Sequence, residues 1–237
     1  MTNPIKTLLL AVVLLFGSSQ VGYAQDYNKG KGNEAYFRGD YAAALKEFRP
    51  LAEQGHADAQ YLLGVMYKNG YGVIQDDREA VRLYRLAAEQ GHAGAQYNLG
   101  VSYSRGEGVI QDDKEAVKWD RLAAKQGDAD AQSNLGWMYE YGRGVIQDKK
   151  EAVRLYRLAA EQGNARAQYN LGAMYHYGEG VIQDMVYAHM WFNIAAASGW
   201  EDAKEGRDIA ANRMTPSQLE KATDLARECV KKEYKDC

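Results

Sequence analysis

The feature that most constrains the fold of this 237-residue chain is a repeat with a fixed period of 36 residues. The five-residue run Gly-Val-Ile-Gln-Asp occurs four times, and its copies end at Asp76, Asp112, Asp148 and Asp184. A period of this size indicates stacked copies of one supersecondary unit. Such arrays are elongated and usually present an extended binding surface, so we expect a protein that holds other molecules rather than transforming them.

Each copy has the pattern of two consecutive helices. In the first copy, small and apolar residues at helical spacing predict one helix over residues 57–69 and a second over 77–90. Asp76 is the expected N-cap of the second helix, Glu79 is expected to complete a capping box, and Gly91 is expected to end the helix in a left-handed conformation. The copies therefore predict an all-α chain of helical hairpins.

The repeated pattern reads Ala-x-x-Leu-Gly-x-Met-Tyr-x-x-Gly-x-Gly-Val, then Asp, then Ala-Val-x-Leu-Tyr-x-x-Ala-Ala-Glu-Gln-Gly. This pattern resembles the Sel1-like repeat, a relative of the tetratricopeptide repeat. The copies that carry it run over residues 59–91, 95–127, 131–163 and 167–199. The resemblance implies a right-handed α/α solenoid. Asp120 departs from the pattern, because the other three copies have an aromatic residue at that position.

The two ends of the array differ from its middle, as capping repeats do. Residues 25–55 lack the five-residue run and resemble a plain tetratricopeptide hairpin that caps the N-terminal end. The four repeats then occupy residues 56–199. Residues 200–237 are expected to form capping helices, the last of which begins with a capping box at Thr215, followed by proline at the first helical position.

Residues 1–24 have the form of a secretory signal, with Lys6 before a short apolar run and a small-x-small site that ends at Ala24. The apolar run is much shorter than the roughly 20 residues that span a bilayer, which disfavours the alternative of an uncleaved anchor. We therefore expect cleavage near Ala24, no stable membrane span afterwards, and a periplasmic or secreted bacterial protein. In such a protein Cys229 and Cys237 are expected to form a disulfide, the alternative being two free or intermolecular thiols.

Charge and motifs argue against several classes of function. The chain has 29 basic and 32 acidic residues and no basic cluster, so we expect no nucleic-acid partner. It has no His-Glu-x-x-His, Cys-x-x-Cys, Gly-x-x-x-x-Gly-Lys or Ser-x-x-Lys motif, so we expect no enzyme, cofactor or metal. His56 and His92 occupy a repeat position that is Asp128 and Asn164 in the other copies, which fits a helix start better than a metal ligand.

Differences between the copies predict where a partner binds. Residues spaced by four, three and four share one face of the first helix, and in this type of solenoid the first helices should line the concave surface. Asparagine side chains offer a donor and an acceptor to a peptide backbone, and tryptophan and tyrosine dominate binding hot spots. The candidate partner-binding residues on this face are Asn98, Arg105, Asn134, Trp137, Tyr141, Asn170 and Tyr177. The alternative is that the asparagines are only solvated and the aromatic residues pack between helices.

The predicted function is an exported interaction scaffold or adaptor, a monomer that binds a protein or peptide in the concave groove. A regulatory role in the bacterial envelope is a setting that the family resemblance implies. Two alternatives from other classes stay open. One is a cell-wall-directed enzyme of the β-lactamase type, and the other is a muropeptide- or sugar-binding module in which Trp137 and the tyrosines stack on sugar rings.

Overall fold

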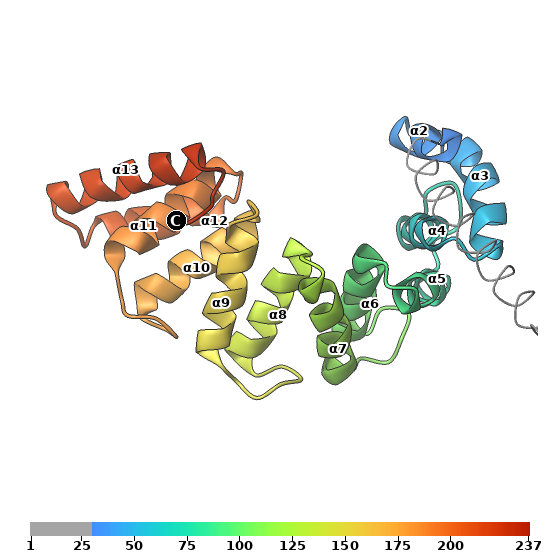
Figure 1. Cartoon of the computed structure of the whole chain (residues 1–237), viewed down its shortest axis with the longest axis horizontal. Coiled ribbons are helices and arrows are strands. Elements are labelled where there is room, and N and C mark those ends of the chain that lie inside the picture. The colour runs from blue at the N-terminus through green and yellow to red at the C-terminus, as the bar shows by residue number, and fades with distance from the viewer. Residues whose placement is uncertain (1–29) are drawn as a thin grey trace, which may run out of the picture.

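The computed structural model of the chain describes residues 30–237, which contain twelve helices and no strand. The helices form an open, curved array in which consecutive helices lie side by side (Figure 1). The predicted all-α solenoid of helical hairpins is therefore confirmed. The predicted secretory signal, residues 1–24, lies outside the described residues. Within the described part of the chain, no helix has both the length and the apolar character needed to cross a membrane.

The helix boundaries agree closely with the two helices predicted for the first copy. The helices are α2 Lys31–Phe37, α3 Tyr41–Glu53, α4 Ala57–Asn69, α5 Asp77–Glu89, α6 Ala93–Arg105, α7 Asp113–Lys125, α8 Ala129–Tyr141, α9 Lys149–Ala160, α10 Ala165–Tyr177, α11 Met185–Ala197, α12 Asp202–Ala211 and α13 Pro216–Lys231. Helices α4 to α11 form four hairpins, and each hairpin packs against the next one. The first helix of every hairpin is thus α4, α6, α8 or α10.

The start of each second helix is fixed by its aspartate. The Asp76 carboxylate accepts hydrogen bonds from the amides of Arg78 and Glu79 at 2.9 and 3.1 Å, which confirms the predicted N-cap. The predicted capping box is wrong. The Asp76 amide donates to the Tyr67 carbonyl at 3.0 Å, so it is not available to Glu79. The Glu79 carboxylate instead accepts two hydrogen bonds from Arg82.

Several glycines are required in each repeat, and two of them show why. Gly91 has φ 92°, and the amides of Gly91 and His92 donate to the last carbonyls of α5, which ends the helix as predicted. Gly108, in the loop before α7, has φ 73°, and a Cβ atom there would lie 2.2 Å from the Asp77 carbonyl oxygen. Each loop therefore packs directly against the backbone of the preceding hairpin, and a side chain at this position would separate the two.

The interior of each hairpin is built from a glycine and a large side chain that covers it. A Cβ atom on Gly64 would lie 2.8 Å from the Tyr84 ring, so the missing side chain makes room for this ring. Tyr156 and Phe192 cover the equivalent glycines of the third and fourth hairpins. In the second hairpin Asp120 takes this place, and its side chain is fully buried.

A ladder of buried glutamines, which the sequence analysis did not predict, joins successive hairpins. Gln96 donates from Nε2 to the Ala88 carbonyl at 3.1 Å and accepts at Oε1 from Gln126 at 2.7 Å. Gln60 and Gln132 are held in the same way by the preceding and following second helices. Because both ends of each amide are satisfied, these polar side chains are buried at little cost.

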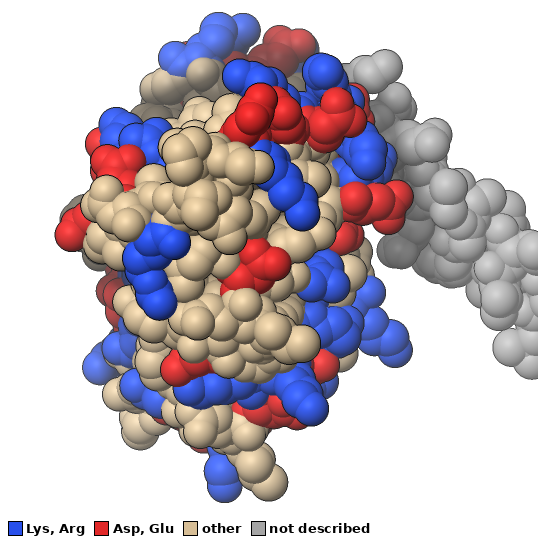
Figure 2. All heavy atoms as spheres, turned by 90° about the vertical axis from the view of Figure 1, so that its left-hand side faces the viewer, with Lys and Arg blue, Asp and Glu red and all other residues tan. Residues whose placement is uncertain are grey.

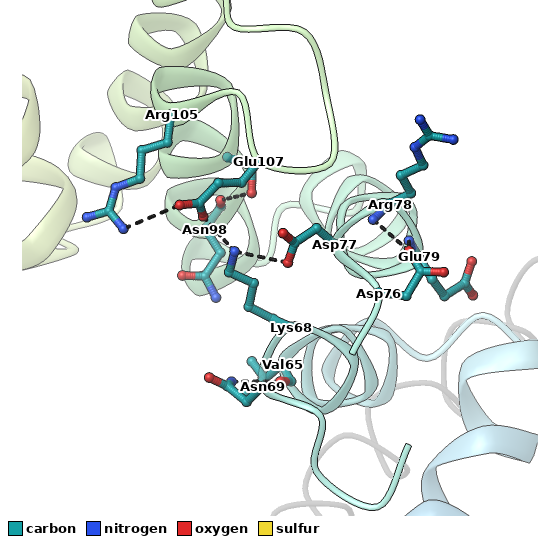
Figure 3. A network of polar contacts seen from close by, with 11 residues as sticks. Val65, Lys68, Asn69, Asp76, Asp77, Arg78, Glu79, Asn98, Arg105 and Glu107 are labelled. Carbon is teal, nitrogen blue, oxygen red and sulfur yellow. Dashed lines mark hydrogen bonds and ion pairs between the residues drawn. The ribbon is translucent and has the colours of Figure 1, made fainter. Parts of the chain in front are cut away.

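Ion pairs also cross from one hairpin to the next. Figure 3 shows the Lys68 ammonium between Asp77 and Glu107, with N–O distances of 3.1 and 2.5 Å. The loop residue that crosses to the preceding hairpin changes sign along the array. Arg143 pairs with Asp113, whereas Glu179 pairs with Lys149. Pairs as exposed as these are screened by solvent and contribute little to stability. The apolar clusters between successive helices hold the stack together, with the glycine and glutamine contacts fixing how closely the hairpins approach.

The C-terminal end of the array is covered by α13, which packs on α11. Its predicted capping box is present, since Thr215 and Gln218 exchange hydrogen bonds between side chain and amide. The predicted disulfide is also present and joins Cys229 to Cys237. The face of the molecule at this end has basic and acidic side chains interspersed with uncharged surface (Figure 2).

Candidate functional site

Two adjoining hollows lie along the first helices of the second, third and fourth hairpins. The larger has a volume of about 650 Å³, and its walls include Arg105, Asn134, Trp137, Arg143, Arg166 and Asn170. The smaller has a volume of about 450 Å³, and its walls include Glu140, Tyr141, Lys149, Asn170, Tyr177 and Glu179. Asn170 and Tyr169 line both hollows. We call the two hollows together the α6–α8–α10 groove.

Six of the seven residues predicted to bind a partner line this groove. Arg105, Asn134 and Trp137 lie in the larger hollow, Tyr141 and Tyr177 in the smaller, and Asn170 in both. Asn98 lines neither hollow. Burial raises the pKa of the Tyr84 hydroxyl, and the nearby Asn98 amide opposes that rise.

The predicted aromatic residues are exposed. Trp137, Tyr141 and Tyr177 have exposed fractions of 36%, 58% and 70%, whereas Tyr156 in the core is fully buried. The ring centroids of Trp137 and Tyr141 are 5.4 Å apart, and the Arg143 guanidinium lies 5.7 Å from the Trp137 ring centroid. The three rings are therefore not packed between helices, and their faces are accessible to another molecule.

The predicted asparagines differ in how much of their hydrogen-bonding capacity is free. Asn134 donates from Nδ2 to the Asp120 carboxylate, so one of its donors is already used inside the protein. The Asn170 side chain makes no hydrogen bond to the residues that the structure describes, so its whole amide group is available. The three asparagines thus do not form a uniform ladder.

Asp120 is the main polar group that the sequence analysis left without a role. Its side chain is fully buried, its Oδ2 accepts the hydrogen bond from Asn134, and its Oδ1 has no hydrogen-bond partner. Burial raises the pKa of Asp120 to about 7, against the hydrogen bond from Asn134 and the attraction of Arg166, which lower it. A carboxyl group that titrates near neutral pH therefore lies directly behind a groove residue.

The larger hollow also contains residues that were not among the predicted site residues: Arg143, Arg166, Tyr169 and Trp200. Arg143 lies in a loop, and the prediction considered only first helices. Its sequence does carry a clue, because the same repeat position is Glu107 in the preceding copy and Glu179 in the following copy. Trp200 occupies the repeat position of His92, Asp128 and Asn164, and its ring centroid lies 6.1 Å from that of Tyr169.

The repeat position of His56 and His92 is the start of each first helix, as predicted, although the His56 side chain makes no capping hydrogen bond. The side chains of His92, Asp128 and Asn164 each accept a hydrogen bond from an amide in the first turn of α6, α8 and α10. These residues therefore cap helices. Among residues 30–237, no three histidine, cysteine, aspartate or glutamate side chains lie close enough together to hold a metal ion.

Comparisons with known proteins agree with this architecture. The family model described as Sel1 repeat matches residues 57–92, 93–128, 129–164 and 165–200. Among solved structures, a protective antigen of uropathogenic Escherichia coli with an SLR fold is 34% identical, with a TM-score of 0.78, over 91% of this chain and 50% of the antigen. A Sel1 repeat protein from Oxalobacter formigenes is 35% identical, with a TM-score of 0.73, over 86% of this chain and 82% of that protein.

A curated relative matches over a shorter region. An exopolysaccharide production negative regulator of Rhizobium leguminosarum bv. viciae is 40% identical over 52 residues, which are 22% of this chain and 20% of the regulator. This chain thus spans about half of the E. coli antigen, and its match covers a fifth of the regulator.

Proposed function

Because the chain belongs to the Sel1 repeat family, we propose that it is an exported scaffold that binds a protein or peptide in the α6–α8–α10 groove. Proteins built from Sel1 repeats generally act as scaffolds for protein interactions. We take the chain to act as a monomer, with α2–α3 and α12–α13 as the caps of the array, and without catalysis or a nucleic-acid partner. The likeness to a regulator of exopolysaccharide production supports a regulatory role in the envelope.

The observation that carries this proposal is the exposed aromatic pair in the groove. Contiguous exposed apolar surface on a soluble protein often marks an interaction site. Trp137 and Tyr141 lie beside an accessible asparagine, Asn170, and above a hollow large enough for several side chains. This combination of aromatic anchors and free amide groups is what an extended polypeptide needs.

Export is supported by the disulfide between Cys229 and Cys237, because such bonds persist mainly in oxidising compartments. We propose that a secretory signal is removed near Ala24. Mass spectrometry of the purified mature protein should then give a chain that starts at Gln25. A chain that keeps its first 24 residues would show that no such cleavage takes place.

The binding proposal is tested by capture of partners from an envelope fraction. The variant Trp137→Ala removes the central anchor, and we expect it to lose at least about tenfold in captured partner, since hot-spot residues contribute 2 kcal/mol or more. The matched control is Phe37→Ala, which removes an exposed aromatic residue of α2 far from the groove. Equal capture by both variants would place the partner elsewhere on the molecule.

A sugar-binding function is the second candidate, because exposed tryptophan and tyrosine rings also stack on sugars. Trp137 reports directly on this possibility. We expect its fluorescence to remain unchanged when muropeptides are added if the ligand is a polypeptide. A saturable fluorescence change that disappears in Trp137→Phe would favour the sugar. Hydrolysis of a chromogenic β-lactam by the pure protein would revive the enzyme alternative.

A further inference from the structure

We infer that the segment bound in the α6–α8–α10 groove carries an acidic side chain, whose carboxylate is held by Arg105 or Arg166 beside Trp137. This inference rests on the proposed function and names the chemistry of the partner. It follows from the way in which charged side chains are distributed and paired around the two hollows.

The larger hollow is lined by three arginines, Arg105, Arg143 and Arg166, and by one acidic residue, Glu107. Glu107 is already bound by Lys68, with an N–O distance of 2.5 Å, as Figure 3 shows. A wall in which guanidinium groups outnumber carboxylates attracts an anionic group, and guanidinium is the cation that best matches a carboxylate in geometry.

Two of these arginines have no close carboxylate partner. The Arg105 guanidinium is largely exposed and lies 3.9 Å from Glu107, at the limit of an ion pair. Arg166 donates to the Ser133 hydroxyl at 3.1 Å and to the Asp130 carbonyl oxygen at 3.3 Å, both of which are uncharged acceptors. Both guanidinium groups therefore keep donors for an incoming carboxylate.

The third arginine is engaged and has a different role. Arg143 makes two hydrogen bonds to the Asp113 carboxylate, at 2.7 and 3.2 Å, while its guanidinium lies over the Trp137 ring. It therefore fixes one side of the indole. The rest of the hollow is open to a partner side chain, which would pass the edge of the Trp137 ring to reach Arg105 or Arg166.

The acidic groups near Arg166 are committed to bonds within the fold. The Asp128 carboxylate caps α8 through the Ala131 amide at 2.8 Å, and the Asp130 carboxylate accepts from Asn164 at 2.8 Å. Asp120 is buried behind Asn134 and offsets part of the Arg166 charge only when it is ionised. These contacts leave the hollow side of Arg166 to an external anion.

The smaller hollow does not compete for an acidic group. Its cation, Lys149, is paired with Glu179 at 2.8 Å, and Glu140 accepts a hydrogen bond from the Tyr156 hydroxyl at 2.6 Å. Of the two hollows, the larger one is therefore the place for the carboxylate. The aromatic and amide groups of the smaller hollow are left for the uncharged part of the same segment.

The test is selection from a library of random dodecapeptides displayed on phage, with the whole mature protein as the target. We expect the enriched peptides to share an aspartate or glutamate. When the double variant Arg105→Gln, Arg166→Gln is the target instead, the enriched peptides should show no preference for an acidic residue. The matched control Arg154→Gln, an arginine of α9 that lines neither hollow, should keep the preference.

Affinity measurements complete the test. A fluorescein-labelled copy of the most enriched peptide should bind at least about tenfold more weakly to the double variant than to the wild type. A peptide in which the acidic residue is replaced by its amide should bind the wild type equally weakly. Both changes remove charge-assisted hydrogen bonds. Enriched peptides without a shared acidic residue would overturn the inference. The proposed groove binding would still stand if Trp137→Ala abolished the binding of those peptides. Failure to enrich any peptide would count against both the inference and the proposed function.

Discussion

Asp120 is the residue at which this chain departs most from its own repeat, and the departure has an energetic consequence. The other hairpins place an aromatic ring over the buried glycine, whereas this one buries a carboxyl group with one unpaired oxygen. Burial raises the pKa of Asp120 to about 7, well above the value of about 3.9 for an exposed aspartate. The folded state therefore binds more protons than the unfolded state between these two values.

The resulting prediction concerns the pH dependence of stability. Since the folded state holds the extra proton, the free energy of unfolding should fall as pH rises from about 4 to about 7, by up to roughly 4 kcal/mol for a shift of this size. Asp120→Asn should remove this dependence. Urea unfolding at pH 5 and pH 8 measures the effect, and Asp224→Asn on the exposed face of α13 is the control. An equal pH dependence in wild type and Asp120→Asn would show that the carboxyl is not buried as described.

At the scale of elements, the array depends on how each loop meets the preceding hairpin. A Cβ atom on Gly144 would lie 2.2 Å from the Asp113 carbonyl oxygen, and its φ of 68° is left-handed. Gly127 shares the left-handed conformation, with φ 94°, but a Cβ atom there would meet nothing within 4 Å. Substitution at either glycine costs backbone strain, but only substitution at Gly144 also overpacks a contact between hairpins. Comparing the two variants therefore isolates the cost of overpacking.

We predict that Gly144→Ala destabilises the protein by about 1–3 kcal/mol more than Gly127→Ala does, because only the former overpacks a contact between hairpins. Urea unfolding of both variants at one pH measures the difference. Equal destabilisation by the two substitutions would mean that the loop can move away from α7 without loss.

The elements were largely predictable from the sequence, and the contacts between them were not. The period and the glycines were enough to predict α4 and α5, because these depend on local capping and spacing. The glutamine ladder was missed because a buried glutamine looks like a solvated one until its partner in the neighbouring helix is known. The bond from Asn134 to Asp120 joins two hairpins, so the spacing within one repeat could not show it.

At the scale of the whole molecule, a repeat array transmits stability mainly between neighbours. The disulfide closes a loop of eight residues at the end of α13, so Cys237→Ser should cost about 2–3 kcal/mol. The effect should be confined to the C-terminal helices. Hydrogen exchange should show faster exchange in α13 and no change in α4, and equal acceleration in both would indicate one cooperative unit instead.

The central claim is that the partner lies in the α6–α8–α10 groove, and photo-crosslinking in living cells tests it most directly. A benzophenone amino acid is placed at Tyr141 in the groove or at Ile74, which is 91% exposed in a loop that lines neither hollow. The account predicts a discrete crosslinked species from position 141 and none from position 74. Crosslinking from position 74 alone would show that the partner binds the loop edge of the solenoid.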